Sequence, residues 1–251
     1  MIYGEHGSGK TTLASMFPRP VIIDVEGGSD DLDVARTDRI RSFDDLQNAM
    51  SWLITNQNEF SSVVYDSLDW LYAIIEKRVQ ERFTEKERSY GKEVHLIADE
   101  FRSLLPGFRR LNDLGKANIF ICHAKNEKVL PTNGDTYHKT MPDLQDATSS
   151  LMMEFCDEVL YLTKRVFTRS EDIGFNRTRS IAIGSEERYL VTSDTGGITA
   201  KNRLAMPVEI PATFEAYASY VVKPTGNDIA GIVKDGSSKN ADIQKDRDNN
   251  E

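Results

Sequence analysis

The sequence has little cysteine, with only two in 251 residues, and only four histidines. Two cysteines exclude both a disulfide framework and a zinc site built from several thiolates. No apolar stretch approaches the roughly 20 residues that a membrane-spanning helix requires. The first residues lack the basic start and the apolar core of a signal peptide, so we expect a cytoplasmic protein with no membrane partner.

Positive charge is also in deficit, because 31 Lys and Arg face 40 Asp and Glu and leave a formal net charge of −9. This balance excludes a uniformly basic nucleic-acid-binding protein but permits a local basic groove. Apolar residues make up 39% of the chain and charged residues 28%, as in ordinary globular proteins. A chain of this length can bury the core of one large domain or of two small ones.

Short apolar runs alternate with helical patterns, which is typical of an α/β fold with a mostly parallel central sheet flanked by helices. The predicted strands of this sheet are residues 2–3, 21–25, 62–66, 118–122 and 158–163. Residues 125–145 are polar and contain turn residues, so they predict a long loop. Residues 180–183 and 188–192 predict a closing antiparallel hairpin. We expect one core domain over residues 1–222 and a disordered polar tail over residues 223–251.

Residues 4–11 match the phosphate-binding pattern G-x-x-x-x-G-K-[ST] and follow a short predicted strand. In this pattern, glycines let successive backbone N–H groups turn towards an anion at the start of a helix. The Lys10 ammonium would reach the β- and γ-phosphates, and the Thr11 hydroxyl would bind Mg²⁺. The sequence therefore predicts a P-loop nucleotide site for ATP and Mg²⁺. Its residues are Gly4, Glu5, His6, Gly7, Ser8, Gly9, Lys10, Thr11 and Thr12.

Two acidic residues end other predicted strands at the same sheet edge. Asp66 follows an apolar strand, so we expect it to hold Mg²⁺ together with Thr11. Glu26 follows the strand at residues 21–25, where its carboxylate could polarise the attacking water. Ordinary surface acids remain the alternative for both.

A family resemblance emerges from the phosphate loop, Glu26, Asp66-Ser67 and the polar His123 at the end of the fourth strand. With residues 200–207, Ala-Lys-Asn-Arg-Leu-Ala-Met-Pro, these motifs resemble the RecA-like recombinases. Within that group the chain is most similar to phage nucleotide-binding proteins of the Sak-type single-strand annealing group, also described as AAA-domain proteins. The resemblance spans about residues 1–215, and the stretches that carry it are residues 25–28, 90–92, 122–125 and 200–203.

The resemblance implies a RecA-like core that assembles with ATP on single-stranded DNA, as a ring or filament, and promotes annealing in phage recombination. It implies that Glu26 is the catalytic base and that His123 senses the γ-phosphate and signals to the following DNA-binding loop. It also implies that Lys201 and Arg203 act on the ATP of a neighbouring subunit, since no acidic pair close in sequence could neutralise them. A single-strand DNA-binding protein is a further candidate partner.

The candidate DNA-binding residues are basic side chains with aromatic residues nearby, namely Lys92, Lys125, Lys128 and Lys139. Neighbouring acidic residues reduce the net positive charge of each of these segments. A solvated surface of mixed charge is the alternative for residues 76–92. Two other functions remain open. One is a small-molecule or nucleotide kinase of the P-loop class, and the other is a scaffold that ATP switches without turnover.

Overall fold

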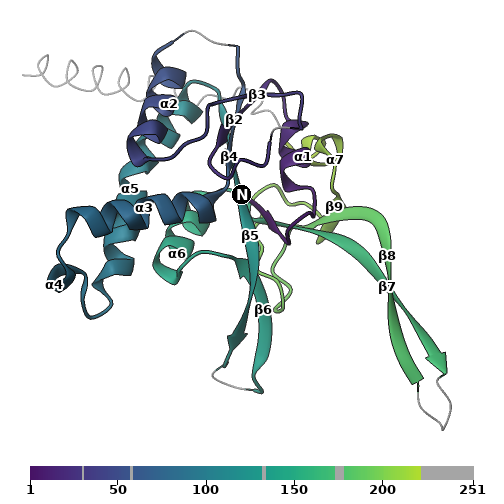
Figure 1. The fold of residues 1–251 in the computed structure, drawn as a ribbon. Helices are drawn as coiled ribbons and strands as arrows, with labels where there is room; N and C mark the ends of the chain where they lie inside the picture. The colour runs from purple at the N-terminus through teal and green to yellow at the C-terminus, as the bar shows by residue number, and fades with distance from the viewer. Residues whose placement is uncertain (30, 57–58, 132–133, 173–177, 222–251) are drawn as a thin grey trace, which may run out of the picture.

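The computed structural model describes residues 1–221 apart from 30, 57–58, 132–133 and 173–177, with side chains described except at 166–186. Helices pack on both faces of one sheet (Figure 1). In chain order the elements are β1 (Ile2–Gly4), α1 (Lys10–Ser15), β2 (Pro20–Asp24), β3 (Ala35–Arg36), α2 (Phe43–Thr55), β4 (Ser62–Asp66), α3 (Leu68–Arg82), α4 (Glu85–Arg88), α5 (Lys92–Asp113), β5 (Ala117–Val129), β6 (Tyr137–Pro142), α6 (Asp146–Phe155), β7 (Leu160–Asp172), β8 (Thr178–Val191), β9 (Glu209–Pro211) and α7 (Phe214–Ala218).

The strand order in the sheet is β3-β2-β4-β5-β1-β7-β8-β9, and β6 pairs with β5. Neighbouring strands from β3 to β7 are parallel, whereas β5–β6, β7–β8 and β8–β9 are antiparallel. The expected α/β class, with a mostly parallel sheet and a C-terminal antiparallel hairpin, is confirmed. Because β5 lies between β1 and β4, His123 at the end of its parallel part lies between the phosphate loop and Asp66.

The central strands are buried on both faces, as expected of parallel strands covered by helices. Tyr3 and Tyr65 point into a core that they share with residues of α2, α3, α5 and α6. Their neighbours Ile2 and Val64 point to the opposite face, into a core with residues of α1 and α7. All five residues of β4 are buried, which explains why this strand gave a continuous apolar run in the sequence.

The predicted loop at residues 125–145 is wrong. β5 continues to Val129 and pairs with β6 in an antiparallel ribbon, from Ala124 opposite Pro142 to Val129 opposite Tyr137. Most residues of this ribbon are partly or fully exposed, so its strands need no apolar face. Their polar sequence consequently resembled that of a loop.

The closing hairpin also differs from the prediction. Residues 180–183 and 188–192 were predicted as its two strands, but 180–183 and 188–191 lie in the single strand β8. The partner of β8 is β7, which continues the predicted strand at residues 158–163 as far as Asp172. Both this hairpin and the β5–β6 hairpin project away from the helices (Figure 1). The predicted tail, residues 223–251, lies outside the described residues.

Aromatic rings form the centre of the core beneath α5. The Phe108 ring lies 5.0 Å from the rings of both Tyr65 and Phe120, measured between centroids, and 5.9 Å from that of Phe155. Phe108 is fully buried. It therefore joins α5 to β4, β5 and α6, the elements behind the phosphate-facing edge of the sheet.

Phe108→Ala should lower the free energy of unfolding by about 3–5 kcal/mol, because truncation removes buried surface and leaves a cavity. Tyr90→Ala is the matched control, since Tyr90 is 99% exposed, and it should change stability by less than about 0.5 kcal/mol. Denaturant titration followed by circular dichroism measures both. Equal effects of the two substitutions would contradict a central structural role for Phe108.

Candidate functional site

The phosphate loop connects β1 to α1 and depends on glycine at positions where a side chain would collide or strain the backbone. A Cβ atom at Gly4 would lie 2.4 Å from the backbone oxygen of Leu162 in β7. Gly9 has a φ of +100°, in the left-handed region that favours glycine. These two glycines let the loop pass close to β7 and turn directly into α1.

Lys10 is buried at the start of α1, and its ammonium points back into the loop. The Nζ atom donates hydrogen bonds to the backbone oxygens of Gly4 and Glu5, both at 2.9 Å. Burial lowers the pKa of Lys10. The hydroxyl of Ser8 is buried and has no hydrogen-bond partner among the described residues. An unpaired donor and a buried ammonium in a glycine-lined loop fit the phosphates of a nucleotide.

Thr11 and Asp66, the two predicted metal ligands, are hydrogen-bonded to each other. The Thr11 hydroxyl donates to Asp66 Oδ2 at 2.8 Å, which joins the start of α1 to the end of β4. Burial raises the pKa of Asp66 to about 6, and the nearby carboxylates of Glu26 and Asp24 add to this shift. A hydroxyl and a carboxylate are hard oxygen ligands, so this pair fits Mg²⁺ bound beside phosphates.

Glu26 is held at the same sheet edge by the backbone of β4. The carbonyl of Asp66 accepts hydrogen bonds from the N–H groups of Val25 and Glu26, at 2.8 and 3.0 Å. Asp24 accepts from the Gly27 N–H at 2.6 Å and the Ser29 hydroxyl at 3.0 Å, which fixes the turn after β2. Asp24 is thus structural, while the Glu26 carboxylate receives one long hydrogen bond, from Ser67 at 3.4 Å.

His123 ends the parallel part of β5 and is bound to a residue that sequence reasoning missed. Asp69, in the first turn of α3, accepts from the His123 backbone N–H at 3.1 Å and lies 2.8 Å from its Nδ1. The hydrogen bond with Asp69 raises the pKa of His123 against the opposing effect of burial. Burial also opposes ionisation of Asp69, but the hydrogen bonds from His123 outweigh it and lower the pKa of Asp69.

These side chains line one cavity of about 370 Å³. Lys10, Thr11, Glu26, Asp66 and His123 come from four separate segments and meet there, as the positions of their strands predicted. The cavity is also lined by the phosphate-loop residues His6, Gly7, Gly9 and Thr12. The exposed side chain of Glu5 is not among its lining, although the Glu5 carbonyl accepts from Lys10.

Comparison with known proteins agrees with this geometry. The family AAA_24, described as an AAA domain, matches residues 1–204. The chain belongs to this AAA-domain family. Membership makes it a nucleotide-binding P-loop ATPase, a class that usually uses Mg²⁺. No curated protein matches the sequence.

Arg188 is a second residue of the AAA-domain site that sequence reasoning missed. It lies on β8, and a Cβ atom at Gly9 would lie 3.2 Å from its Nε. The Arg188 side chain therefore packs across the phosphate loop and lines the same cavity, and no described acid forms an ion pair with it. An unpaired guanidinium at this place suits an anionic ligand. Nothing local in the sequence indicated this contact, because β8 is remote from the loop along the chain.

Lys201 and Arg203 lie outside the nucleotide cavity, the cavity of about 370 Å³ lined by Lys10, Glu26 and His123. Lys201 Nζ donates to the carbonyls of Met153, Glu154 and Cys156 at 2.9, 3.2 and 2.7 Å, at the C-terminal end of α6. Arg203 forms an ion pair with Asp157. Both cations therefore have partners within their own chain. The partners are distant in sequence, and a cation suits the negative end of a helix.

The predicted DNA-binding lysines divide into two groups. Lys92 begins α5, whereas the other three lie on the β5–β6 hairpin. Lys125 donates to the Leu144 carbonyl at 2.9 Å, and Lys139 lies 2.8 Å from Asp194. Lys128 is exposed, and among the described residues it has no hydrogen-bond or ion-pair partner. Of the three hairpin lysines, Lys128 is the one most available to a ligand.

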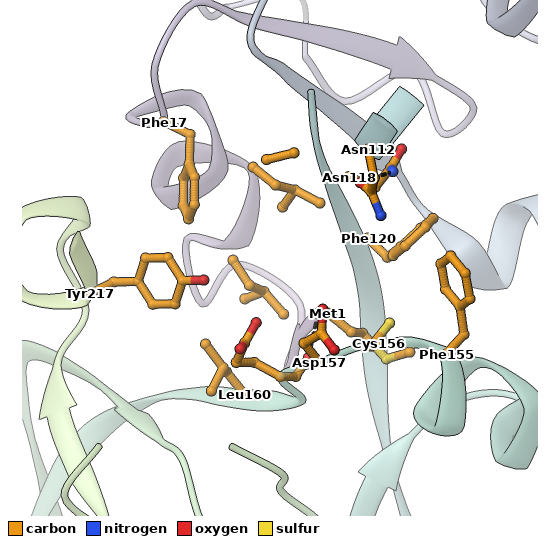
Figure 2. A pocket seen from close by; sticks show the side chains of 14 residues that line it. Met1, Phe17, Asn112, Asn118, Phe120, Phe155, Cys156, Asp157, Leu160 and Tyr217 are labelled. Atoms are coloured by element: carbon orange, nitrogen blue, oxygen red, sulfur yellow. Dashed lines mark hydrogen bonds between the residues drawn. The ribbon is translucent and has the colours of Figure 1, made fainter. Parts of the chain in front are cut away.

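A separate cavity of about 380 Å³ lies at the opposite edge of the sheet and shares no lining residue with the nucleotide cavity. Figure 2 shows the rings of Phe17, Phe120, Phe155 and Tyr217 around it. Asp157 and Glu158 supply its acidic groups. Its lining has no Lys, Arg or His side chain to receive a phosphate. Within the described residues, no helix is both long and apolar enough to cross a membrane.

Lys201→Ala should lower the free energy of unfolding by about 1–3 kcal/mol, because three carbonyls lose a charged donor. Arg203→Ala is the matched control, since its ion pair with Asp157 is mostly exposed and should contribute about 0–1 kcal/mol. Denaturant titrations of both variants, with ATP hydrolysis measured in parallel, provide the test. A Lys201→Ala protein of unchanged stability that cannot hydrolyse ATP would show that Lys201 acts on nucleotide instead.

Proposed function

We propose that this protein is a Mg²⁺- and ATP-dependent single-stranded DNA-binding ATPase that promotes annealing or strand pairing. In this proposal it belongs to the RecA-like Sak-type group and acts as an oligomer in phage recombination, in the host cytoplasm. The observation that supports this most is the course of β5. This single strand carries His123 in the nucleotide cavity and continues without a break into an exposed hairpin.

The shared strand offers a direct mechanical link between nucleotide and hairpin. His123 and Lys128 are five residues apart in β5, and the hairpin ladder begins at Ala124. The His123 carbonyl also accepts from the Asp143 N–H at 2.8 Å, just after β6. A contact of His123 with a γ-phosphate would thus act on both strands of the hairpin at their base.

The outer part of the hairpin has the chemistry that single-stranded DNA requires. Lys128 lies directly opposite His138, so both side chains are on the same face of the ribbon. Tyr137 and Leu130 are exposed near the turn. Single-stranded DNA is bound by cations that contact phosphates and by aromatic rings on which bases stack. The hairpin presents both.

The nucleotide cavity contains what hydrolysis needs. Lys10 can bind phosphate oxygens, and Thr11 and Asp66 can hold Mg²⁺, which would supply charge neutralisation at the phosphates. The Glu26 carboxylate faces the same cavity and is weakly hydrogen-bonded, so it is available to accept a proton from water. Water activation favours hydrolysis over transfer to a bound hydroxyl.

ATP hydrolysis with and without single-stranded DNA tests the proposal against its alternatives. Stimulation by DNA supports it. Transfer of phosphate to a small molecule or nucleotide would identify a kinase, and ATP binding without turnover would identify a scaffold. Either of these two outcomes contradicts the proposal.

Glu26→Gln should lower the rate of ATP hydrolysis by about 10²–10⁴-fold, because it removes the proton acceptor and keeps the side-chain shape. ATP affinity should be unchanged. The matched control is Asp31→Asn, which removes an exposed carboxylate from the lining of the same cavity. If the Glu26→Gln protein hydrolyses ATP as fast as the control, another group activates the water.

Combined Lys128→Ala and Tyr137→Ala substitutions should weaken single-stranded DNA binding in the presence of ATP. They should also flatten its logarithmic salt dependence by about 0.7, the value for one lost phosphate contact. The control pair is Lys92→Ala with Tyr90→Ala, which also removes an exposed lysine and an exposed ring. Fluorescence anisotropy over a salt series measures both. Loss of binding in the control pair alone would place the DNA site at the start of α5.

A further inference from the structure

Three side chains with metal-binding atoms converge on one side of the nucleotide cavity. The ligand atoms of His6, Glu26 and His123 all lie within 4.8 Å of one another. They come from the phosphate loop, the turn after β2 and the strand β5. Two of the four histidines in the chain are therefore next to the same carboxylate. Small movements of these side chains would bring all three ligands to a single ion.

The hydrogen bond between His123 and Asp69 orients the histidine ring for binding a metal ion. Asp69 occupies the Nδ1 side of the ring at 2.8 Å and also receives the backbone N–H, so the ring is held in orientation. The remaining nitrogen, Nε2, is left for a ligand. Histidines that bind metals usually donate their other N–H to a carboxylate or carbonyl in this way, and the carboxylate makes the imidazole a stronger ligand.

His6 and Glu26 are less constrained. The His6 ring stacks on the ring of His123, with 3.8 Å between centroids and 27° between planes. Because His6 is exposed, its ring can turn out of this stack and present a nitrogen. The Glu26 carboxylate is committed only to the long hydrogen bond from Ser67 among the described contacts.

The charge around the cluster also favours a cation. Asp66 and Asp69 lie beside it, and the ammonium of Lys10 is turned towards the backbone oxygens of Gly4 and Glu5. A divalent ion at this place would be compensated by the neighbouring carboxylates.

We propose that His6, Glu26 and His123 form a binding site for a transition-metal ion such as Zn²⁺, separate from the Mg²⁺ site of Thr11 and Asp66. Two imidazoles and one carboxylate are a ligand set that Zn²⁺ accepts in proteins. Mg²⁺ prefers oxygen ligands and would not compete for this set.

Occupancy of the site would regulate ATP hydrolysis. An ion bound by Glu26 takes away the carboxylate that polarises water, so metal binding and turnover exclude each other. This regulatory consequence rests on the proposed function, whereas binding of the ion does not.

The test is a titration of the untagged full chain with Co²⁺, without nucleotide or DNA, followed by visible absorption and by equilibrium dialysis. One Co²⁺ should bind per chain, resist excess Mg²⁺ and be displaced by Zn²⁺, which binds such ligands more tightly than Co²⁺. Asp69→Asn should weaken Co²⁺ binding by about 10–100-fold, as expected for an outer partner of a ligand. His6→Ala removes a direct ligand and should weaken it at least as much.

His95→Ala is the matched control, because His95 is an exposed histidine of α5 outside the cluster, and this variant should bind Co²⁺ like the unmodified chain. His6 is exposed, so its replacement leaves the core intact, and circular dichroism verifies this. If His6→Ala and Glu26→Gln bind Co²⁺ as tightly as the unmodified chain, the site does not exist. This result is distinguishable from a failure of the proposed ATPase function, since no ATP is present.

Discussion

Asp66 is the residue on which the geometry of the nucleotide site depends, because its side-chain carboxylate and its backbone carbonyl bind different segments. Its carboxylate accepts from Thr11 in the phosphate loop, and its carbonyl accepts from the backbone of Val25 and Glu26. The end of β4 thereby fixes the start of α1 and the turn after β2 to each other. Displacement of this strand would move the candidate metal ligands and the candidate base together.

The arrangement is possible because β4 is buried on both faces. Its neighbours β2 and β5 are also parallel to it, so the polar residues that end the parallel part of each strand collect at one edge, while their apolar residues fill two cores. A strand order with β5 between β1 and β4 brings His123 into the centre of that edge. The parallel strands that form the core therefore also position the residues of the site.

Much of the site could be predicted because its signals are local. The phosphate loop is continuous in sequence, and Asp66 and Glu26 each end an apolar run, so strand direction alone placed them at one edge. Asp69 and Arg188 could not be found in this way. Asp69 reaches His123 only because α3 packs beside β5, and the Arg188 side chain reaches Gly9 only because β8 pairs with β7, which lies beside the loop. The exposed β5–β6 ribbon was mistaken for a loop because strands with little burial carry no apolar alternation.

The folded-back ammonium of Lys10 has a consequence for the exchange of nucleotide. Without a ligand, the buried charge is already solvated by two carbonyl oxygens of its own loop. A phosphate that binds Lys10 therefore replaces hydrogen bonds that the ammonium already makes. The net gain in binding free energy is consequently smaller than the new contacts alone would give. The same internal solvation remains available when product departs.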